Sequence, residues 1–296
     1  MSDKHPVIAV TGSSGAGTSY VREAFVNIFR REEIDAGIIQ GDSFHSLTRE
    51  AFKRGVDEAA NLGDNHLSHF GPEANDFLAL QHCFKEYGET GMTQQRYYLH
   101  NKNQVEKHSK LLNMPLQVGE FTPWENMPEN TELLLYEGLH GLVVDQEQGV
   151  DLTPYVDLGI GVVPSVNLEW IQKIHRDHEV RGYNEQQVVE TILRRMPDYV
   201  NYITPQFSLT DMNFQRVPMV DTSNPFVSRD IPSLDESKVV IRFKRPSKYN
   251  IDFPFLLDMI EHSFMSRRNT IVVPGNKMSL AIETILTPII EKLVGR

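Results

Sequence analysis

The fold class is decided by residues 7–19, Val7-Ile8-Ala9-Val10-Thr11-Gly12-Ser13-Ser14-Gly15-Ala16-Gly17-Thr18-Ser19. The β-branched beginning predicts a buried strand, and the glycines predict a turn whose backbone N–H groups can face inward. Apolar residues then recur at helical spacing from about residue 18 to residue 31. A strand, a glycine loop and a helix in this order favour an α/β fold that binds a phosphate group.

Residues 12–19 match the phosphate-loop pattern G-x-x-x-x-G-K-[ST] except at one position, where Thr18 replaces the lysine. The glycines and the helix N-terminus can still bind a phosphate chain, and the Ser19 hydroxyl can ligate Mg²⁺. A kinase with this loop needs a lysine or arginine from another element to neutralise the terminal phosphates. A plain glycine turn is the structural alternative, and the flanking strand and helix argue against it. The residues expected to bind ATP are Gly12, Ser13, Ser14, Gly15, Ala16, Gly17, Thr18, Ser19 and Tyr20.

A dinucleotide-binding loop is the second interpretation of the same glycines. Residues 11–17 are one residue short of the T-G-x-x-x-G-x-G loop of short-chain dehydrogenases, and Tyr98 with Lys102 forms a Y-x-x-x-K pair. In those enzymes the pair lies on a long helix, whereas here it lies in a polar segment without helical periodicity. The pattern therefore favours the phosphate loop.

Strand and helix patterns alternate along the rest of the chain. Continuous apolar runs at 133–136 and 156–163 predict interior parallel strands. Further strands are expected at 38–39, 238–243 and 270–273, and helices at 48–62, 73–87, 167–181, 184–202, 254–260 and 278–294. Pro197 should kink or end its helix. We expect one domain over 1–296, of the P-loop kinase type: a doubly wound, mainly parallel sheet with helices on both faces. Segment 91–127 is polar and Pro-containing, and we expect a small β-rich, lid-like excursion there.

Composition limits the classes of function. Among 296 residues, 29 Lys and Arg against 40 Asp and Glu give a net charge of −11, which argues against a broad surface for nucleic acid or anionic membrane. Cys83 is the single cysteine, so an intramolecular disulfide is impossible. The absence of a membrane-length apolar run and of a secretory segment leads us to expect a cytoplasmic protein.

Two carboxylates follow predicted strands, Asp42 after 38–39 and Glu137 after 133–136. In a doubly wound sheet both face the crevice at the carboxyl ends of the strands. One such carboxylate can hold Mg²⁺, and one nearer the substrate can accept a hydroxyl proton. A capping role is the commoner explanation for each alone, and the neighbouring phosphate loop shifts the balance toward function.

The predicted helix at 167–181 carries alternating charge, with Glu169, Lys173, Asp177 and Arg181 at intervals of four and Arg176 among them. Exposed ion pairs, worth about 0.3–0.5 kcal/mol each, would explain this pattern structurally. The missing loop lysine favours a functional interpretation, in which the three cations neutralise phosphates. Near Asp42, His45 and Arg49 could clamp a sugar phosphate, and Tyr98 and His100 could close over it.

Five segments together define a family pattern: VTGSSGAGTS (10–19), GDSFH (41–45), YEGLHG (136–141), NLEWIQKIHRD (167–177) and VDTSNP (220–225). They resemble the bacterial (class I) phosphoribulokinases over nearly the whole chain, including the lysine-free loop. The resemblance implies ATP- and Mg²⁺-dependent phosphorylation of D-ribulose 5-phosphate. It implies Asp42 as general base on the C1 hydroxyl, Glu137 with Ser19 at the metal, Lys173 on the transferring phosphoryl group and Asp177 as a carboxylate near MgATP. The sugar phosphate would be held by His45, Arg49, Tyr98, His100, Arg176 and Arg181.

The same resemblance implies a homo-oligomer activated by NADH. Positions associated with subunit coupling and effector binding match Arg31, Arg195, Arg242 and Arg267. Two alternatives stay open: a related kinase for another small acceptor, such as uridine or pantothenate, and a non-catalytic nucleotide or NADH sensor. The three cations at 173–181 favour a phosphorylated acceptor, and the set Asp42, Glu137, Lys173 and Asp177 argues against a sensor.

Overall fold

The computed structural model describes residues 5–13, 18–63, 67–181, 184–227 and 230–296, without the side chains of 18, 19, 177–181, 185 and 187. The main sheet consists of β1 (Val7–Thr11), β2 (Ala36–Gln40), β5 (Leu133–Gly138), β8 (Leu158–Val163), β9 (Met212–Pro218), β10 (Ser237–Phe243), β11 (Phe264–Arg267) and β12 (Thr270–Pro274). Their order is β11-β12-β10-β9-β8-β1-β5-β2. From β9 to β2 all neighbours run parallel, and β10, β12 and β11 extend the sheet antiparallel. This arrangement confirms the doubly wound, mainly parallel fold.

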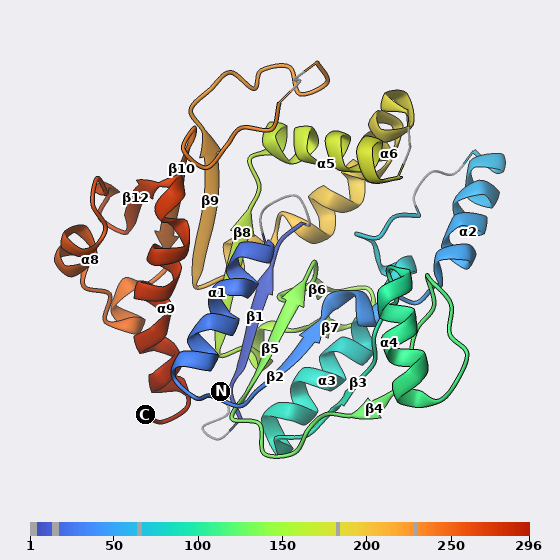
Figure 1. Cartoon of the computed structure of the whole chain (residues 1–296), viewed down its shortest axis with the longest axis horizontal. Helices are drawn as coiled ribbons and strands as arrows, with labels where there is room; N and C mark the ends of the chain where they lie inside the picture. Colours follow the sequence, from blue (N-terminus) through green and yellow to red (C-terminus); the bar gives the residue numbers. More distant parts are fainter. Residues whose placement is uncertain (1–4, 14–17, 64–66, 182–183, 228–229) are drawn as a thin grey trace.

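Helices cover both faces of the sheet (Figure 1). One face packs against α1 (Thr18–Arg31), α8 (Phe253–Met259) and α9 (Met278–Leu293), and the other against α3 (Phe77–Thr90). The central strand β1 serves both cores, because Ile8 and Val10 point to the first and Val7 and Ala9 to the second. Burial of each larger apolar side chain contributes about 1.5–3 kcal/mol. Two packed layers thus fix the strand ends that carry the site.

The remaining helices are α2 (Arg49–Asn61), α4 (Lys102–Leu112), α5 (Val166–Arg181), α6 (Glu185–Asp198) and α7 (Gln206–Leu209). The helix expected at 184–202 is divided, because α6 ends one residue beyond Pro197. A π-type turn follows, in which the Thr204 N–H donates to the Tyr199 carbonyl at 3.0 Å. Proline cannot supply an N–H to the helix, so the backbone changes its hydrogen-bond pattern at this point.

Segment 91–127 contains the expected antiparallel pair, formed by β3 (Gln94–Gln95) and β4 (Glu125–Asn126). Between them lies α4, which the sequence analysis missed. Asn101 caps this helix by accepting from the Gln104 N–H at 3.0 Å. Apolar periodicity does not reveal this helix, because the residue that it buries is His108 whereas Leu111 is exposed. A second short pair joins β6 (Val144–Asp145) and β7 (Val150–Asp151).

The strands β6 and β7 were not predicted, and two strands of the main sheet, β9 and β11, were missed as well. In β9, Met212 and Phe214 are buried whereas the residues between and after them are half-exposed. Asn213 and Gln215 alternate with these two residues as in a half-buried strand, but Arg216 ends the alternation after four residues, which makes it a short signal. None of the helices in the described part of the chain combines the length and apolarity that a bilayer crossing requires.

Candidate active site

Gly12 and Ser13, the first two residues of the glycine-loop pattern, lie at the carboxyl edge of the parallel strands, beside the end of β5. The register pairs Val10 with Glu137 and Thr11 with Gly138. The Gly12 N–H then donates to the Gly138 carbonyl at 3.1 Å. Glu137 therefore ends its strand next to the loop, as the sheet topology predicts. In Figure 1 this edge points toward α5 and α6.

Two glycines bring the Asp42 turn to the same edge. A Cβ atom on Gly41 would lie 2.8 Å from Cα of Gly138 and 2.6 Å from the Tyr136 hydroxyl, and one on Gly138 would lie 2.7 Å from Cα of Gly41. Such distances exclude any side chain at either position. The close backbone approach of β2 and β5 places Asp42, the next residue, at the edge that carries Glu137.

Asp42 belongs to a 3₁₀ turn (Gly41–Phe44), and its carboxylate faces two imidazoles. Oδ1 lies 3.2 Å from Nε2 of His45, and Oδ2 lies 3.1 Å from Nε2 of His100. Burial by itself would raise the pKa of Asp42, but the hydrogen bonds from His100 and His45 outweigh it and hold that pKa well below its usual range. Because its pKa is lowered, the carboxylate is ionised at neutral pH. Its side chain is 39% exposed, so a ligand can reach it.

Two further predicted residues lie around Asp42. Arg49 donates from Nη2 to the His100 carbonyl at 3.2 Å. The Tyr98 ring stands edge-on to both imidazoles, with centroid separations of 5.9 Å to His45 and 4.9 Å to His100. Residues from two separate segments, 42–49 and 98–100, are thus gathered about one carboxylate.

Two of the predicted cations of α5, Lys173 and Arg176, act on a carboxyl that also interacts with Ser13 of the glycine-loop pattern. Glu169, a buried residue of the same helix, connects these cations with the loop residue Ser13. Burial raises its pKa, and the hydroxyls of Ser13 and Tyr199 and the charges of Lys173 and Arg176 oppose that rise. One carboxyl therefore interacts with the loop residue Ser13 and with both cations, so Lys173 and Arg176 stand at the phosphate-loop end of the cleft.

Several predicted residues fall outside the described part of the structure. They are Ser14, Gly15, Ala16 and Gly17, together with the side chains of Thr18, Ser19, Asp177 and Arg181. The backbone of Asp177 and Arg181 continues α5, so both follow Lys173 along the same helix. Tyr20 is 41% exposed in the first turns of α1.

The sequence analysis missed Arg22, whose Nε lies 3.7 Å from Oε2 of Glu137. This side chain brings a cation to the strand end from α1, one helical turn after Thr18. The spacing of four residues was a usable signal, because residues i and i+4 share a helix face.

Arg96 was missed as well, and it fastens the turn that carries Asp42. Its guanidinium donates from Nε to the Ser43 carbonyl at 2.7 Å and from Nη2 to the His45 carbonyl at 2.9 Å. The Ser43 hydroxyl donates in return to the Arg96 carbonyl at 2.6 Å. The guanidinium also covers the Phe121 and Trp124 rings, at 3.9 and 4.6 Å from their centroids.

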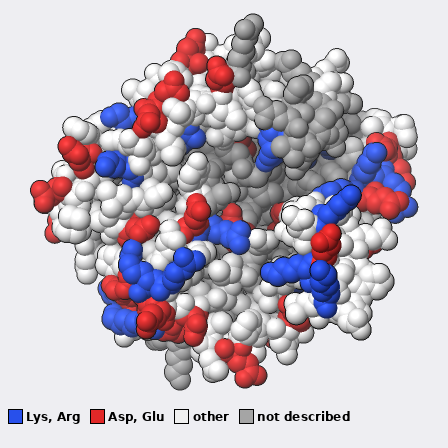
Figure 2. Space-filling model, viewed as in Figure 1, with Lys and Arg blue, Asp and Glu red and all other residues white. Residues whose placement is uncertain are grey.

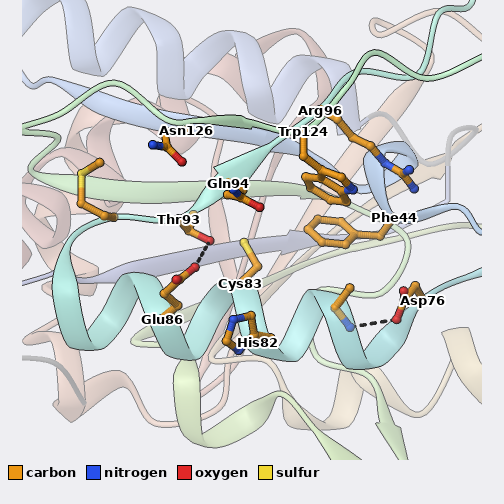
Figure 3. A pocket seen from close by; sticks show the side chains of 12 residues that line it. Phe44, Asp76, His82, Cys83, Glu86, Thr93, Gln94, Arg96, Trp124 and Asn126 are labelled. Carbon is orange, nitrogen blue, oxygen red and sulfur yellow. Dashed lines mark hydrogen bonds between the residues drawn. The ribbon is translucent and has the colours of Figure 1, made fainter.

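Behind this turn lies a pocket of about 410 Å³ between α3 and the β3–β4 pair. Figure 3 shows Phe44 and Trp124 side by side at one end and the hydrogen bond from Thr93 to Glu86 at the other. The pocket lies on the α3 side of the Asp42 turn, away from the glycine loop, so we assign the chemistry to the strand ends and not to this cavity.

The four arginines expected at an interface or effector site occupy different elements. Arg31 on α1 is bound to Glu32, Glu283 and Thr287, at 2.7, 2.8 and 2.7 Å. Arg242 on β10 and Arg267 on β11 are exposed, and the strand register sets both opposite Thr270 of β12. Arg195 on α6 lies over the Phe70 ring, 5.8 Å from its centroid.

Charge on the face that carries α1, α9 and the strand ends is mixed in sign. Figure 2 shows Lys and Arg interspersed with Asp and Glu across this face, without one broad basic area among the described residues. The cations near the cleft are therefore local features of a chain whose net charge is −11.

Comparison with known proteins places the chain in a family. Residues 7–223 match the model of the Phosphoribulokinase / Uridine kinase family. "Phosphoribulokinase" of Nitrobacter vulgaris is 54% identical over 293 residues, covering 99% of this chain and 98% of that protein. "Probable phosphoribulokinase" of Escherichia coli K12 is 51% identical over 294 residues, with the same coverage. The solved structure of phosphoribulokinase from Rhodobacter spheroides superimposes with a TM-score of 0.88 at 51% identity, covering 99% of this chain and 98% of that one. Full-length similarity of this kind, on the fold and edge described above, shows that the chain belongs to the Phosphoribulokinase / Uridine kinase family.

Proposed function

We propose that this chain transfers the terminal phosphoryl group of ATP to the C1 hydroxyl of D-ribulose 5-phosphate, which yields ribulose 1,5-bisphosphate. The observation that carries the proposal is the ionised Asp42 carboxylate, held between His45 and His100 at the strand edge beside the glycine loop. The similarity to proteins named phosphoribulokinase supports the same reaction.

Asp42 is the proposed general base. It must be unprotonated to accept the hydroxyl proton, and its lowered pKa keeps it so. A low pKa also makes a carboxylate a weak base, so the sugar hydroxyl has to replace part of the imidazole hydrogen bonding when substrate binds. His100 is the donor with more freedom to move, because its side chain is 40% exposed whereas that of His45 is 8% exposed.

Positive charge for the transferring group comes from α5. Lys173 would take the place of the absent loop lysine, with Arg176 close by and Arg181 further along the helix. We propose that Arg176 and Arg181, with His45, Arg49, Tyr98 and His100, hold the sugar phosphate.

The residues at the strand edge fit Mg²⁺. Glu137 offers carboxylate oxygen beside the loop, and Ser19 follows the loop in sequence, which are the hard ligands that this ion prefers. Bound there, Mg²⁺ would neutralise charge on the phosphates of ATP. Asp177 is the further carboxylate that we assign to the ATP side.

The assay that tests the proposal measures ADP release in the presence of D-ribulose 5-phosphate, uridine or pantothenate in parallel. We expect turnover with the sugar phosphate and identification of the bisphosphate as product. Turnover with uridine or pantothenate alone would replace the acceptor, and nucleotide binding without turnover on any acceptor would favour a sensor.

We also propose a homo-oligomer activated by NADH, with Arg31, Arg195, Arg242 and Arg267 at the contacts. Arg242 on β10 and Arg267 on β11 are both exposed and lie on either side of Thr270 of β12, which supports an anion site on that side. Sedimentation velocity and direct NADH titration, each with the double variant Arg242→Ala, Arg267→Ala as control, test assembly and binding separately from turnover. Unchanged NADH affinity in the double variant would remove both arginines from the effector site.

A further inference from the structure

Asn75 is a buried carboxamide that reaches the site through His45. It precedes α3 and is 4% exposed. Its Nδ2 donates to the carbonyl oxygens of His69 at 3.0 Å and Gly71 at 2.7 Å. Because only the amino end of the amide can donate, these two bonds fix its orientation and turn Oδ1 toward His45.

The ring of His45 lies between two acceptors. Its Nδ1 is 2.8 Å from Oδ1 of Asn75, and its Nε2 is 3.2 Å from Oδ1 of Asp42. An amide oxygen and an ionised carboxylate cannot donate, so each contact requires a hydrogen on the histidine nitrogen. A neutral imidazole carries one such hydrogen and leaves one contact repulsive. The geometry is satisfied by the imidazolium form.

The main chain holds this pair of residues together. His45 and Asn75 form an antiparallel bridge. On either side of it, the Ser46 N–H donates to the Ala74 carbonyl at 2.9 Å and the Asp76 N–H donates to the Phe44 carbonyl at 2.8 Å. The distance between amide and imidazole is therefore set by backbone pairing and does not depend on a bound ligand.

We propose that Asn75 is a positioning residue that holds His45 as an imidazolium with Nε2 directed at Asp42. The inference rests on the proposed function for the roles of Asp42 and His45. Its consequence is a cation fixed beside the reacting carboxylate before the sugar phosphate arrives, so that little reorganisation is needed when the substrate binds.

Other titratable or charged groups also face this cluster. They are Asp42 of the 3₁₀ turn, His69 from the segment before α3, Tyr98 and His100 from the segment after β3, His140 from the segment after β5, and Arg195 of α6, which acts through His69. Burial lowers the pKa of both His69 and His140, so these two imidazoles are neutral neighbours near pH 7. Neither of them therefore places a second positive charge next to His45 near pH 7.

The first test is direct. In the free enzyme with ¹⁵N-labelled histidine, His45 is identified among the 11 histidines by its loss in His45→Gln. We expect both of its nitrogens to be protonated at about pH 8, where an unperturbed imidazole is neutral. A singly protonated His45 in the native enzyme would overturn the proposal whatever the enzyme phosphorylates, because this readout does not use activity.

The second test compares Asn75→Leu, which removes the acceptor, with Asn75→Asp, which keeps an oxygen toward His45. We expect His45 to lose a proton at about pH 8 in the Leu variant and to keep both in the Asp variant. The loss in kcat/KM for the sugar phosphate in Asn75→Leu should be at least about tenfold larger at about pH 9 than at about pH 6, where His45 is reprotonated. The Asp variant should show no such dependence.

Asn213→Leu is the matched control, because the Asn213 amide likewise donates to a backbone carbonyl, that of Phe207 at 2.8 Å, but lies on β9. It should lose stability without changing the pH profile. A loss in Asn75→Leu that is equal at all pH values would show a structural role alone and reject the proposal. If Asn75→Leu does not fold, the native spectrum and the Asp variant still decide.

Discussion

Single side chains decide whether this edge can perform phosphoryl transfer. Asp42 is ionised because two imidazoles outweigh its desolvation, and Lys173 is the residue proposed to replace the cation that the glycine loop lacks. Each group can be changed without removing a large part of either hydrophobic core, since neither belongs to them. Substitutions here therefore report on chemistry more than on folding.

Asp42→Asn should lower kcat about 10²–10⁴-fold, because the amide keeps the shape of the side chain but cannot accept the proton. ATP affinity, measured by calorimetry, should stay near that of the native chain. A variant with nearly full kcat would remove Asp42 from the role of base.

Lys173→Met should lower kcat more than it raises KM for ATP, because the missing cation acts on charge that develops in the transition state. Steady-state kinetics with ATP as the varied substrate measure both constants. Thr18→Ala is the paired variant, and a greater loss there than in Lys173→Met would show that the cation has been assigned to the wrong element.

The buried His140 should make the free energy of unfolding depend on pH. Burial lowers its pKa to about 3, and its Nε2 lies 3.0 Å from the Phe70 carbonyl. The unfolded chain takes up this proton below about pH 6.5 and the folded chain does not, so stability is complete above that pH and falls as pH drops toward 3. The slope for one group is about 1.4 kcal/mol per pH unit.

Urea unfolding of the native chain and of His140→Gln between about pH 4 and pH 7 checks this dependence. The amide of Gln can still donate to Phe70 but does not titrate, so the variant should lose less stability on acidification. Parallel curves for the two proteins would contradict the assignment.

At the scale of elements, the short turn that carries Asp42 is held in place by residues that are distant in sequence. Arg96, which follows β3, binds the Ser43 and His45 carbonyls, and α3 begins directly after the bridge between His45 and Asn75. The turn itself is too short to hold a shape alone. Its rigidity comes from the β3–β4 excursion on one side and from α3 on the other.

Arg96→Lys should lower kcat while leaving ATP affinity intact, because an ammonium group cannot serve both carbonyls and stack on two rings as a planar guanidinium does. The loss of one or two such bonds should cost about 1–3 kcal/mol of stability. Urea unfolding and kinetics, with the exposed Arg54→Lys of α2 as control, check both effects. Equal behaviour of the two variants would show that the turn does not depend on Arg96.

At the scale of the whole molecule, the sheet and its two helical layers protect the single thiol. Cys83 on α3 is 4% exposed, and burial raises its pKa to about 12. A thiol that is neither ionised nor exposed reacts slowly with alkylating reagents.

Alkylation of Cys83 by iodoacetamide should therefore proceed at the rate of unfolding and speed up across the urea transition. Mass spectrometry of the labelled fraction, compared with circular dichroism at the same urea concentrations, checks this. Rapid labelling of the folded chain would show that the layer formed by α3 opens separately from the rest of the fold.

The sequence predicted those parts of the fold that depend on local pattern. The strand and helix that flank the glycine-rich residues, the interior strands at 133–136 and 156–163, and the helix at 167–181 were all predicted and confirmed. The missed elements carry only a weak pattern, because the alternation of β9 ends after four residues and the residue that α4 buries is His108 and not an apolar one. The roles of the individual site residues stay predictions until the variants above are measured.

What the sequence by itself determined is the order of elements and the kinds of group at each strand end, because periodicity and glycine turns are properties of neighbouring residues. The tertiary structure alone decided that His100 and Asn75 meet the turn that carries Asp42 and His45, and that Arg22 reaches Glu137. These partners come from separate segments, and only sheet order, register and the close approach of Gly41 and Gly138 bring them within hydrogen-bond distance. Asn75 belongs to no local motif, so no spacing in the chain could have placed it at the site.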